Sequence, residues 1–301
     1  MYSKLNINKS SKIARLFRCY IVIPLRILRI SVSDLIRQDG IEHAGYLAFL
    51  CILSLFPFLI FLISIIGLFG GSQDGVKIIQ DVLLAMPKEM SKALYPRINE
   101  IISGPGQSFL TIAIIGVIWT ASSSVEGCRT VLNRAYRVNF PPPYLTRRLI
   151  SILQFFFLAF SVLLALIIFI LIPKILAIVK TFLPFYINLE SFFFSFSKLA
   201  IYIILFATTT LLYYVLPNAK QKITQTFPGA LLAVLLWTIL QKIFTFYISN
   251  FDQVNYVYGS LAGIIISLMF FYLVSLVFIL GAEFNYHFHR VYYILLKKYE
   301  S

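Results

Sequence analysis

Charged residues are scarce in this chain, and acidic residues are scarcer than basic ones. Asp, Glu, Lys and Arg together make up 13% of its 301 residues, compared with about 25% in soluble domains. So little charge leaves too little polar surface to enclose a water-soluble core, which excludes an ordinary soluble globular protein. The 12 acidic residues are scattered along the sequence, so we expect no carboxylate cluster of the kind that binds catalytic metal ions.

Three further absences limit the chemistry. Cys19, Cys51 and Cys128 form no CxxC pair, which is typical of a chain with reduced thiols. No glycine loop of the P-loop or dinucleotide-binding type is present, so direct use of nucleotide energy is not expected. His287 and His289 are two residues apart and would point to different sides of a helix, with no Cys or carboxylate set to complete a zinc site. We therefore expect no enzyme activity, no metal and no cofactor.

Long uncharged apolar runs dominate the sequence, in which 59% of the residues are hydrophobic. Six runs approach or exceed the length of about 20 residues that a helix needs to cross a bilayer. They span residues 44–70, 109–124, 149–173, 199–215, 228–247 and 258–282. The sequence therefore predicts an all-α, polytopic membrane protein with six transmembrane helices. The run 109–124 is the shortest, and its helix needs flanking polar residues to complete the crossing.

The basic residues predict the orientation of these helices. Segments on the side of the two termini carry 18 Lys and Arg, segments on the opposite side carry 7, and Lys242 lies within a run. Because basic residues accumulate on the cytoplasmic side, both termini are expected in the cytoplasm. This divides the chain into a basic cytoplasmic or interfacial segment (1–43), a membrane domain (44–282) with an extracytoplasmic insert at 72–107, and a cytoplasmic tail (283–301).

The segment before the first run has the pattern of an amphipathic helix. Its arginines gather on one side of a helix, among apolar residues, and are Arg15, Arg18, Arg26, Arg29 and Arg37. This pattern favours a segment that lies on the cytoplasmic leaflet and binds anionic lipid head groups, with a bend at Pro24. The alternative is a solvated basic tail with no role at the membrane.

A stripe of polar residues in the fifth run provides the candidate substrate site. Residues spaced three to four apart share one side of a helix, and polar residues within a membrane span face the protein interior or a water-filled cavity. The candidate residues of this cavity are Thr209, Thr238, Gln241, Lys242 and Thr245. Two alternatives remain open: Lys242 extends to the outer interface, and threonines such as Thr209 bond the carbonyl one turn back.

Glu283 follows the last run and lies near the basic segments of the expected cytoplasmic side. A carboxylate at this depth can anchor the helix at the interface, pair with an inner arginine or couple transport to protons. We favour a structural ion pair.

Four stretches, taken in order, resemble the YihY/BrkB family of bacterial inner-membrane proteins, once labelled ribonuclease BN. They read AGYLAFLCILSLFPFLIFLISIIGLFG from Ala44, IWTASSSVEGCRTVLNRAYRV from Ile118, LPNAKQKITQTFPGALLAVLLW from Leu216 and YGSLAGIIISLMFFYLVSLVFILGAEFN from Tyr258. The positions that match the family's motifs are Tyr46, Ser54, Pro57, Asn133, Pro217, Asn218, Pro228, Gly229, Tyr258, Gly259, Gly281, Glu283 and Asn285.

The resemblance implies a multi-pass protein of the bacterial inner membrane, with six helices, both termini inside and a role in the cell envelope. Our first hypothesis is a transporter or flippase-like protein that moves a lipid or another amphipathic anion. The alternative is a membrane scaffold that transports nothing, and the least favoured is an enzyme such as the ribonuclease of the old label. Membrane lipids are the expected partners and nucleic acid is not, while the sequence leaves the substrate, coupling ion, oligomeric state and protein partners open.

Overall fold

The computed structural model describes residues 22–69, 107–139, 142–161, 189–250 and 262–300. These residues form helices joined by turns and short loops, and no strand occurs among them. The expected all-α class is therefore confirmed for the described part of the chain. Residues 72–106 of the insert, residues 162–173 of the third run and residues 258–261 of the sixth run lie outside the described residues.

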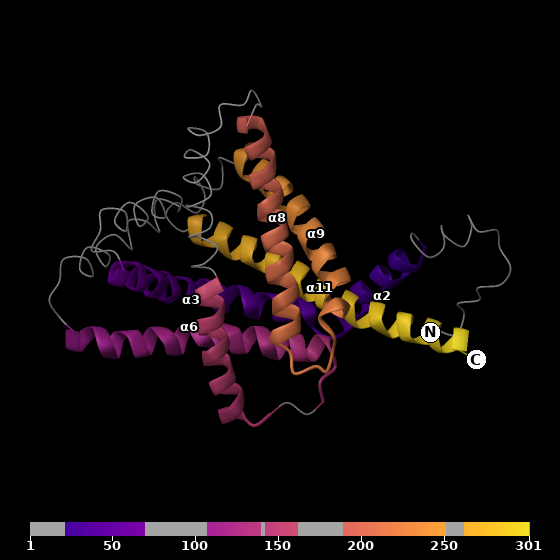
Figure 1. Cartoon of the computed structure of the whole chain (residues 1–301), viewed down its shortest axis with the longest axis horizontal. Helices are drawn as coiled ribbons and strands as arrows, with labels where there is room; N and C mark the ends of the chain where they lie inside the picture. The colour runs from indigo at the N-terminus through magenta and orange to yellow at the C-terminus, as the bar shows by residue number, and fades with distance from the viewer. Residues whose placement is uncertain (1–21, 70–106, 140–141, 162–188, 251–261, 301) are drawn as a thin grey trace.

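Long helices overlap all six apolar runs (Figure 1). They are α3 (Gly40–Phe69), α6 (Gln107–Ala135), a helix described over residues 144–161, α8 (Leu189–Val215), α9 (Phe227–Asn250) and α11 (Ala262–Glu300). A shorter helix, α2 (Ile23–Arg37), precedes them, and a single 3₁₀ turn, η2 (Ile223–Thr226), leads into α9.

Two helices extend well beyond the apolar runs that predicted them. α6 continues past Ser124 to Ala135, and α11 continues past Ala282 to Glu300. The sequence has no glycine or proline between Gly281 and Glu300, so nothing local ends the helix where its hydrophobicity falls. The sixth predicted span ends at Ala282, and the helix itself continues through the predicted tail.

Two segments are long and apolar enough to cross a membrane by length and composition, Ile223–Ile248 and Ala262–Val291. Gly40–Leu55 and Tyr202–Val215 are shorter apolar segments of the same kind. On α9 a row of outward-facing side chains is more than half exposed, namely Leu231, Leu235, Ile239, Ile243 and Phe246. Water would make such a row unfavourable, whereas lipid chains suit it.

α11 is the central helix of the described bundle. It packs against α3, α9, α2 and α6, while α8 packs on α9. In Figure 1, α3 and α6 lie side by side, and the pair α8 and α9 stands across them. Aromatic rings fill the junction: Phe278 of α11 stacks on Tyr213 of α8 and on Trp237 of α9. One apolar core therefore joins the N-terminal and C-terminal helices.

α9 and α11 cross with their backbones in direct contact. A Cβ atom on Gly229 would overlap the carbonyl oxygen of Gly281, and one on Gly281 would overlap the hydroxyl of Tyr213 and lie 2.8 Å from the carbonyl oxygen of Gly229. Both glycines were motif positions of the family resemblance. Their role is explained by packing, because small residues allow membrane helices to approach closely.

α2 has the expected amphipathic pattern, and its buried face packs on α11. The buried residues recur every fourth position and are Ile23, Ile27, Ser31 and Leu35. Pro24 occupies the first turn, where a proline costs no helical hydrogen bond, so within the described residues it begins the helix and does not interrupt it. Arg15 and Arg18 lie outside the described residues.

Candidate functional site

Buried polar side chains gather at one end of the helix bundle. We call this region the polar end and define it as the last turns of α6, the start of the helix over residues 144–161, the loop Leu216–Lys222, residues Glu283–Arg290 of α11 and the C-terminal half of α2. Polar groups removed from water are costly unless they are paired. Their partners therefore describe how the polar end is built.

Arg129 of α6 is completely buried and holds three segments together. Its guanidinium donates to the Leu216 carbonyl at 3.2 Å, to Ser151 at 2.8 Å, and to the side chain of Gln154. Glu126, one turn earlier, supplies the counter-charge at 3.0 Å. Arginine suits this place because its planar fork presents five donors in fixed directions. The result is a charge whose hydrogen bonds are met by two helices and a loop.

Two asparagines join α6 to the loop that follows α8. Asn133 donates to the side-chain oxygen of Asn218 at 3.0 Å and accepts from the backbone N–H of Asn218 at 2.7 Å. This reciprocal pair fixes the loop directly after Pro217, which is buried. The three residues were motif positions of the resemblance, and the structure brings them together.

A third asparagine joins α11 to the start of α9. Asn285 is buried; its side-chain oxygen accepts from the Gly229 N–H at 2.6 Å, and its amide nitrogen donates to the Tyr136 hydroxyl at 3.2 Å. An N–H in the first turn of a helix has no partner within that helix. Asn285 supplies this partner from the neighbouring helix, and it thereby fixes where α9 crosses α11.

Arg137 ends α6 in an unusual backbone conformation. The Val138 N–H bonds the Asn133 carbonyl at 2.8 Å and the Arg137 N–H bonds the Arg134 carbonyl at 3.0 Å. These two bonds form a Schellman motif, whose left-handed position is usually glycine. Arg137 occupies it with a φ of 59°, which costs a non-glycine residue about 1–2 kcal/mol. The contacts of the Arg137 side chain must therefore offset this cost.

Its partner is Glu283 of α11, which is 1% exposed. The two guanidinium nitrogens of Arg137 donate to the two carboxylate oxygens of Glu283 at 2.8 and 2.9 Å. This geometry is the bidentate pair that gives the strongest charge-assisted bonds. Burial alone would lower the pKa of Arg137, but the bonds to Glu283 and its charge raise it above its ordinary value. The favoured interpretation of Glu283 as an ion-pair partner is confirmed.

Two more ionisable groups meet this pair. Asp34 of α2 lies 3.4 Å from Arg137 and 3.0 Å from the Nε2 atom of His287, which in turn lies 3.8 Å from Glu283. One ligand atom from each of Asp34, Glu283 and His287 falls within 4.8 Å of the others. The expectation that no carboxylate set accompanies the histidines is therefore wrong, because α2 supplies a carboxylate from more than 240 positions away in the sequence. In the structure the cation held by these carboxylates is Arg137.

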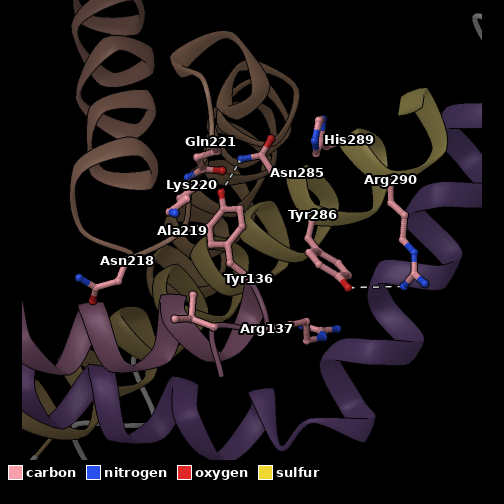
Figure 2. A pocket seen from close by; sticks show the side chains of 11 residues that line it. Tyr136, Arg137, Asn218, Ala219, Lys220, Gln221, Asn285, Tyr286, His289 and Arg290 are labelled. Atoms are coloured by element: carbon pink, nitrogen blue, oxygen red, sulfur yellow. Dashed lines mark hydrogen bonds between the residues drawn. The ribbon is translucent and has the colours of Figure 1, made fainter. Parts of the chain in front are cut away.

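A cavity of about 490 Å³ lies beside this cluster. It is bounded by the end of α6, the loop after α8 and α11, and Figure 2 shows its lining side chains around the rings of Tyr136 and Tyr286. Lys220, Arg290 and Arg137, the last paired with Glu283, bring their positive charges to its wall, and no carboxylate lines it among the residues that the structure describes. A concave site with charges of one sign concentrates ions of the opposite sign. The cavity is therefore suited to an anion.

The predicted cavity residues lie elsewhere. Thr209 is buried in α8 and bonds the Leu205 carbonyl at 2.7 Å, and Thr238 bonds the Val234 carbonyl at 2.8 Å. The other three residues, Gln241, Lys242 and Thr245, are exposed on α9. None of the five lines the cavity at the polar end. The two threonines make the bonds to the preceding turn that the alternative interpretation describes, and the substrate role of the stripe stays a prediction.

The remaining motif positions have separate places. Tyr46 is 47% exposed on α3, Ser54 bonds the Cys51 carbonyl at 3.2 Å, and Pro57 lies inside the same helix. Pro228 stands in the first turn of α9, directly before Gly229. Tyr258 and Gly259 lie outside the described residues. The motif positions that meet at the polar end thus come from α6, the loop after α8, α9 and α11.

Sequence reasoning missed Arg137, Tyr136 and Asp34. All three lie outside the apolar runs, Asp34 before the first and Tyr136 and Arg137 after the second, and a search for polar residues inside membrane spans passes over them. One signal was available. The expected cytoplasmic segments are rich in basic residues, so a buried Glu283 was expected to form an ion pair with an arginine from one of them. Nothing local in the sequence indicated Arg137, because its role depends on the end of one helix lying against the middle of another.

A family model described as Virulence factor BrkB matches residues 31–298. The chain belongs to the BrkB family. The matched residues run from the second half of α2 nearly to the end of α11 and so include the polar end. The resemblance seen in the sequence is therefore confirmed.

Relatives extend over the same region. The putative ribonuclease-like protein YfkH of Bacillus subtilis is 29% identical over 262 residues, which are 84% of this chain and 91% of the relative. A UPF0761 membrane protein of Pseudoalteromonas translucida is 27% identical over 80% of this chain and 78% of its own. Another, of Aeromonas salmonicida, is 41% identical over 76 residues, or 25% of this chain and 26% of its own. No solved structure matches. This BrkB chain is accordingly a membrane protein.

Proposed function

We propose that this BrkB chain is a multi-pass protein of the bacterial inner membrane that transports a lipid or another amphipathic anion, in the manner of a transporter or flippase. It would cross the bilayer six times with both termini in the cytoplasm. The excess of 18 over 7 basic residues on the side of the termini supports this orientation. In this arrangement the polar end lies at the cytoplasmic surface.

The observation that carries the proposal is the basic cavity of the polar end. A protein that only joins neighbours through apolar helix faces has no need for three cations around an open space of about 490 Å³. A protein that takes an anionic head group from the cytoplasmic leaflet requires such a place, next to apolar helix surfaces that can accept the chains. α9 offers the apolar surface, because its row of exposed apolar side chains lies along the helix that follows the loop of the cavity.

The polar residues farther along α9 would serve the same path. Lys242 lies about 21 Å along the helix from Pro228 by the rise of an α-helix, and Gln241 and Thr245 are exposed beside it. In this proposal they form a second binding position for the anionic group on its way to the opposite leaflet. Replacing Lys242 by methionine would then slow transport without changing the amount of protein.

α2 is proposed to rest on the membrane surface. Its outer face mixes exposed apolar and basic side chains, which are Val22, Leu25, Arg26, Arg29, Val32, Ile36 and Arg37. This mixture is typical of helices that lie at the boundary of head groups and acyl chains. The anionic lipids that we expect as partners would bind here.

A flippase assay tests the transport proposal. Purified protein is reconstituted into vesicles that contain fluorescent phosphatidylglycerol, and a membrane-impermeant reductant bleaches the label in the outer leaflet only. We expect the protein to expose the inner label as well, and the double change Lys220→Gln and Arg290→Gln to slow this exchange. Lys222→Gln is the matched control, because Lys222 lies in the same loop, is exposed and does not line the cavity.

Bleaching no faster than in protein-free vesicles would overturn transport of this lipid class. The alternative, a scaffold that transports nothing, would then be favoured, and the close crossing of α9 and α11 at Gly229 and Gly281 suits such a rigid part. A ribonuclease remains the least favoured function. It would need RNA cleavage by the purified protein in the presence of divalent metal ions.

A further inference from the structure

We infer that the cavity of the polar end is a binding site for a phosphate group carried by an organic molecule. The inference rests on the proposed function only for its role in the cell, because binding can be measured whether or not transport occurs. The phosphate could belong to a lipid head group or to a soluble phosphorylated compound. Both sources present the same chemistry to the cavity.

The charges of the wall come from three separate segments. Arg137 follows α6, Lys220 belongs to the loop after α8, and Arg290 belongs to α11. Figure 2 shows Lys220 beside Tyr136 and Arg290 beside Tyr286, so the two exposed cations flank the rings. Cations at the wall of a cavity lower the free energy of an anion bound there. These cations are part of the folded chain before a ligand binds.

The number and placement of donors favour phosphate over a carboxylate. A carboxylate has two oxygens in one plane, which a single arginine can satisfy. A phosphate group presents more oxygens, directed to several sides, and can bond cations from different segments at once. Gln221, Tyr286 and His289 also line the wall and add side chains that can form hydrogen bonds around these charges.

The size of the cavity fits a small organic phosphate. About 490 Å³ falls within the range of roughly 300–1,000 Å³ that ligand sites of folded proteins occupy. A bare phosphate ion would leave most of this volume empty. The rings of Tyr136 and Tyr286 provide apolar faces on which the organic part of the ligand can lie.

Arg137 gives the site a connection to the rest of the polar end. Its two terminal nitrogens already bond Glu283, and Asp34 of α2 lies 3.4 Å away. A ligand phosphate would compete with these carboxylates for the same guanidinium. Arg137 is therefore unsuitable for testing the site, since its loss would also break the ion pair. Lys220 and Arg290 are exposed, and neither belongs to the pair with Glu283.

Isothermal titration of the full chain in neutral detergent tests the inference. The probes are glycerol 3-phosphate, short-chain phosphatidic acid, inorganic phosphate and acetate. We expect at least one of the two organic phosphates to bind, and acetate to bind at least about tenfold more weakly. The double change Lys220→Gln and Arg290→Gln should weaken the organic phosphate at least about tenfold, and Lys222→Gln should leave its affinity unchanged. Thermal unfolding of each variant verifies that it is folded.

The comparison of the two organic phosphates identifies the source of the phosphate group. Binding of phosphatidic acid without glycerol 3-phosphate assigns a lipid head group, and the reverse assigns a soluble compound; both results support the site. The inference is overturned if neither organic phosphate binds, if acetate binds as tightly, or if the folded double variant binds as tightly as the unchanged chain. Binding without flippase activity would overturn the proposed transport and leave this site in place.

Discussion

Arg129 and Lys242 are two cations in apolar helices, and their surroundings are opposite. Arg129 is completely buried at the polar end, where carbonyl oxygens and side chains from several segments accept its hydrogen bonds. Lys242 is exposed on α9, where its long side chain can reach water or lipid head groups. One charge holds segments together, and the other contributes to an outer surface.

The same contrast separates the two regions to which they belong. At the polar end, buried polar groups come from segments far apart in the sequence and bond one another. Along α9, the outward face is an apolar row with a polar stripe beside it. The contacts of the polar end therefore fix how the helices pack on one another, whereas the exposed face of α9 determines which surroundings the bundle contacts. Substitutions in the two regions should differ in kind.

The largest expected effect is the loss of Arg129. Arg129→Met should lower the free energy of unfolding by about 3–5 kcal/mol, because it breaks a buried charge network. The Leu216 and Arg147 carbonyls and the Gln154 side chain lose a donor, and half-buried Glu126 keeps only the longer ion pair with Arg147 at 3.6 Å. The measurement is denaturant unfolding of the purified protein in detergent. Lys242→Met is the control, and an exposed site of this kind should change stability by at most about 0.5 kcal/mol. Equal effects of the two changes would remove the distinction between the regions.

The close crossing of α9 and α11 should give the next largest effect. Gly281→Ala places a methyl group against the Tyr213 hydroxyl and the Gly229 carbonyl, and overpacking of this kind costs about 1–3 kcal/mol. Gly263→Ala on the same helix meets no atom within 4 Å and should be neutral or stabilising by up to about 1 kcal/mol. Thermal unfolding of both variants side by side is the measurement. A Gly281→Ala protein as stable as the Gly263→Ala protein would contradict direct backbone contact at this crossing.

A feature of the fold could be predicted from the sequence when the residues that produce it lie close together along the chain. The apolar runs are continuous stretches of chain, so they located helices such as α3, α8 and α9 correctly. The runs did not give the full length of the helices, because α6 and α11 continue beyond the point where hydrophobicity falls. The motif positions Asn133, Asn218 and Asn285 entered only through the family resemblance.

The polar end itself depends on contacts that no local pattern contains. Asp34 meets Glu283 and His287 across about 250 positions of sequence, and only the packing of α2 on α11 brings them together. Arg137 was passed over for a second reason. Its importance is visible in the backbone, since it takes a left-handed conformation where glycine is usual, and sequence alone does not reveal a φ angle.

The pair of Arg137 and Glu283 should show a moderate effect. In a double-mutant cycle with Arg137→Gln and Glu283→Gln, we expect a coupling energy of about 1–3 kcal/mol, because the two groups form a bidentate pair. Unfolding in detergent at constant pH supplies the four free energies. Additive effects would mean that the pair does not stabilise the fold.

The backbone of Arg137 permits an independent check on the same pair. Arg137→Gly and Arg137→Ala both remove the guanidinium, but only glycine tolerates the left-handed conformation without strain. The glycine variant should therefore be more stable than the alanine variant by about 1 kcal/mol. Thermal unfolding of the two proteins decides this. A more stable alanine variant would contradict the Schellman ending of α6.

The smallest expected effect concerns the outer face of α2, which combines exposed basic and apolar side chains. Each exposed arginine near an anionic membrane contributes about 1 kcal/mol of attraction. In the full chain without its native cysteines, a fluorophore on a cysteine introduced at Val32 should be quenched by brominated lipid more strongly in anionic than in neutral vesicles. Arg26→Gln with Arg29→Gln should reduce this difference. Equal quenching in both kinds of vesicle would place α2 away from the lipid surface, and its arginines would then belong with the solvated charges of the chain.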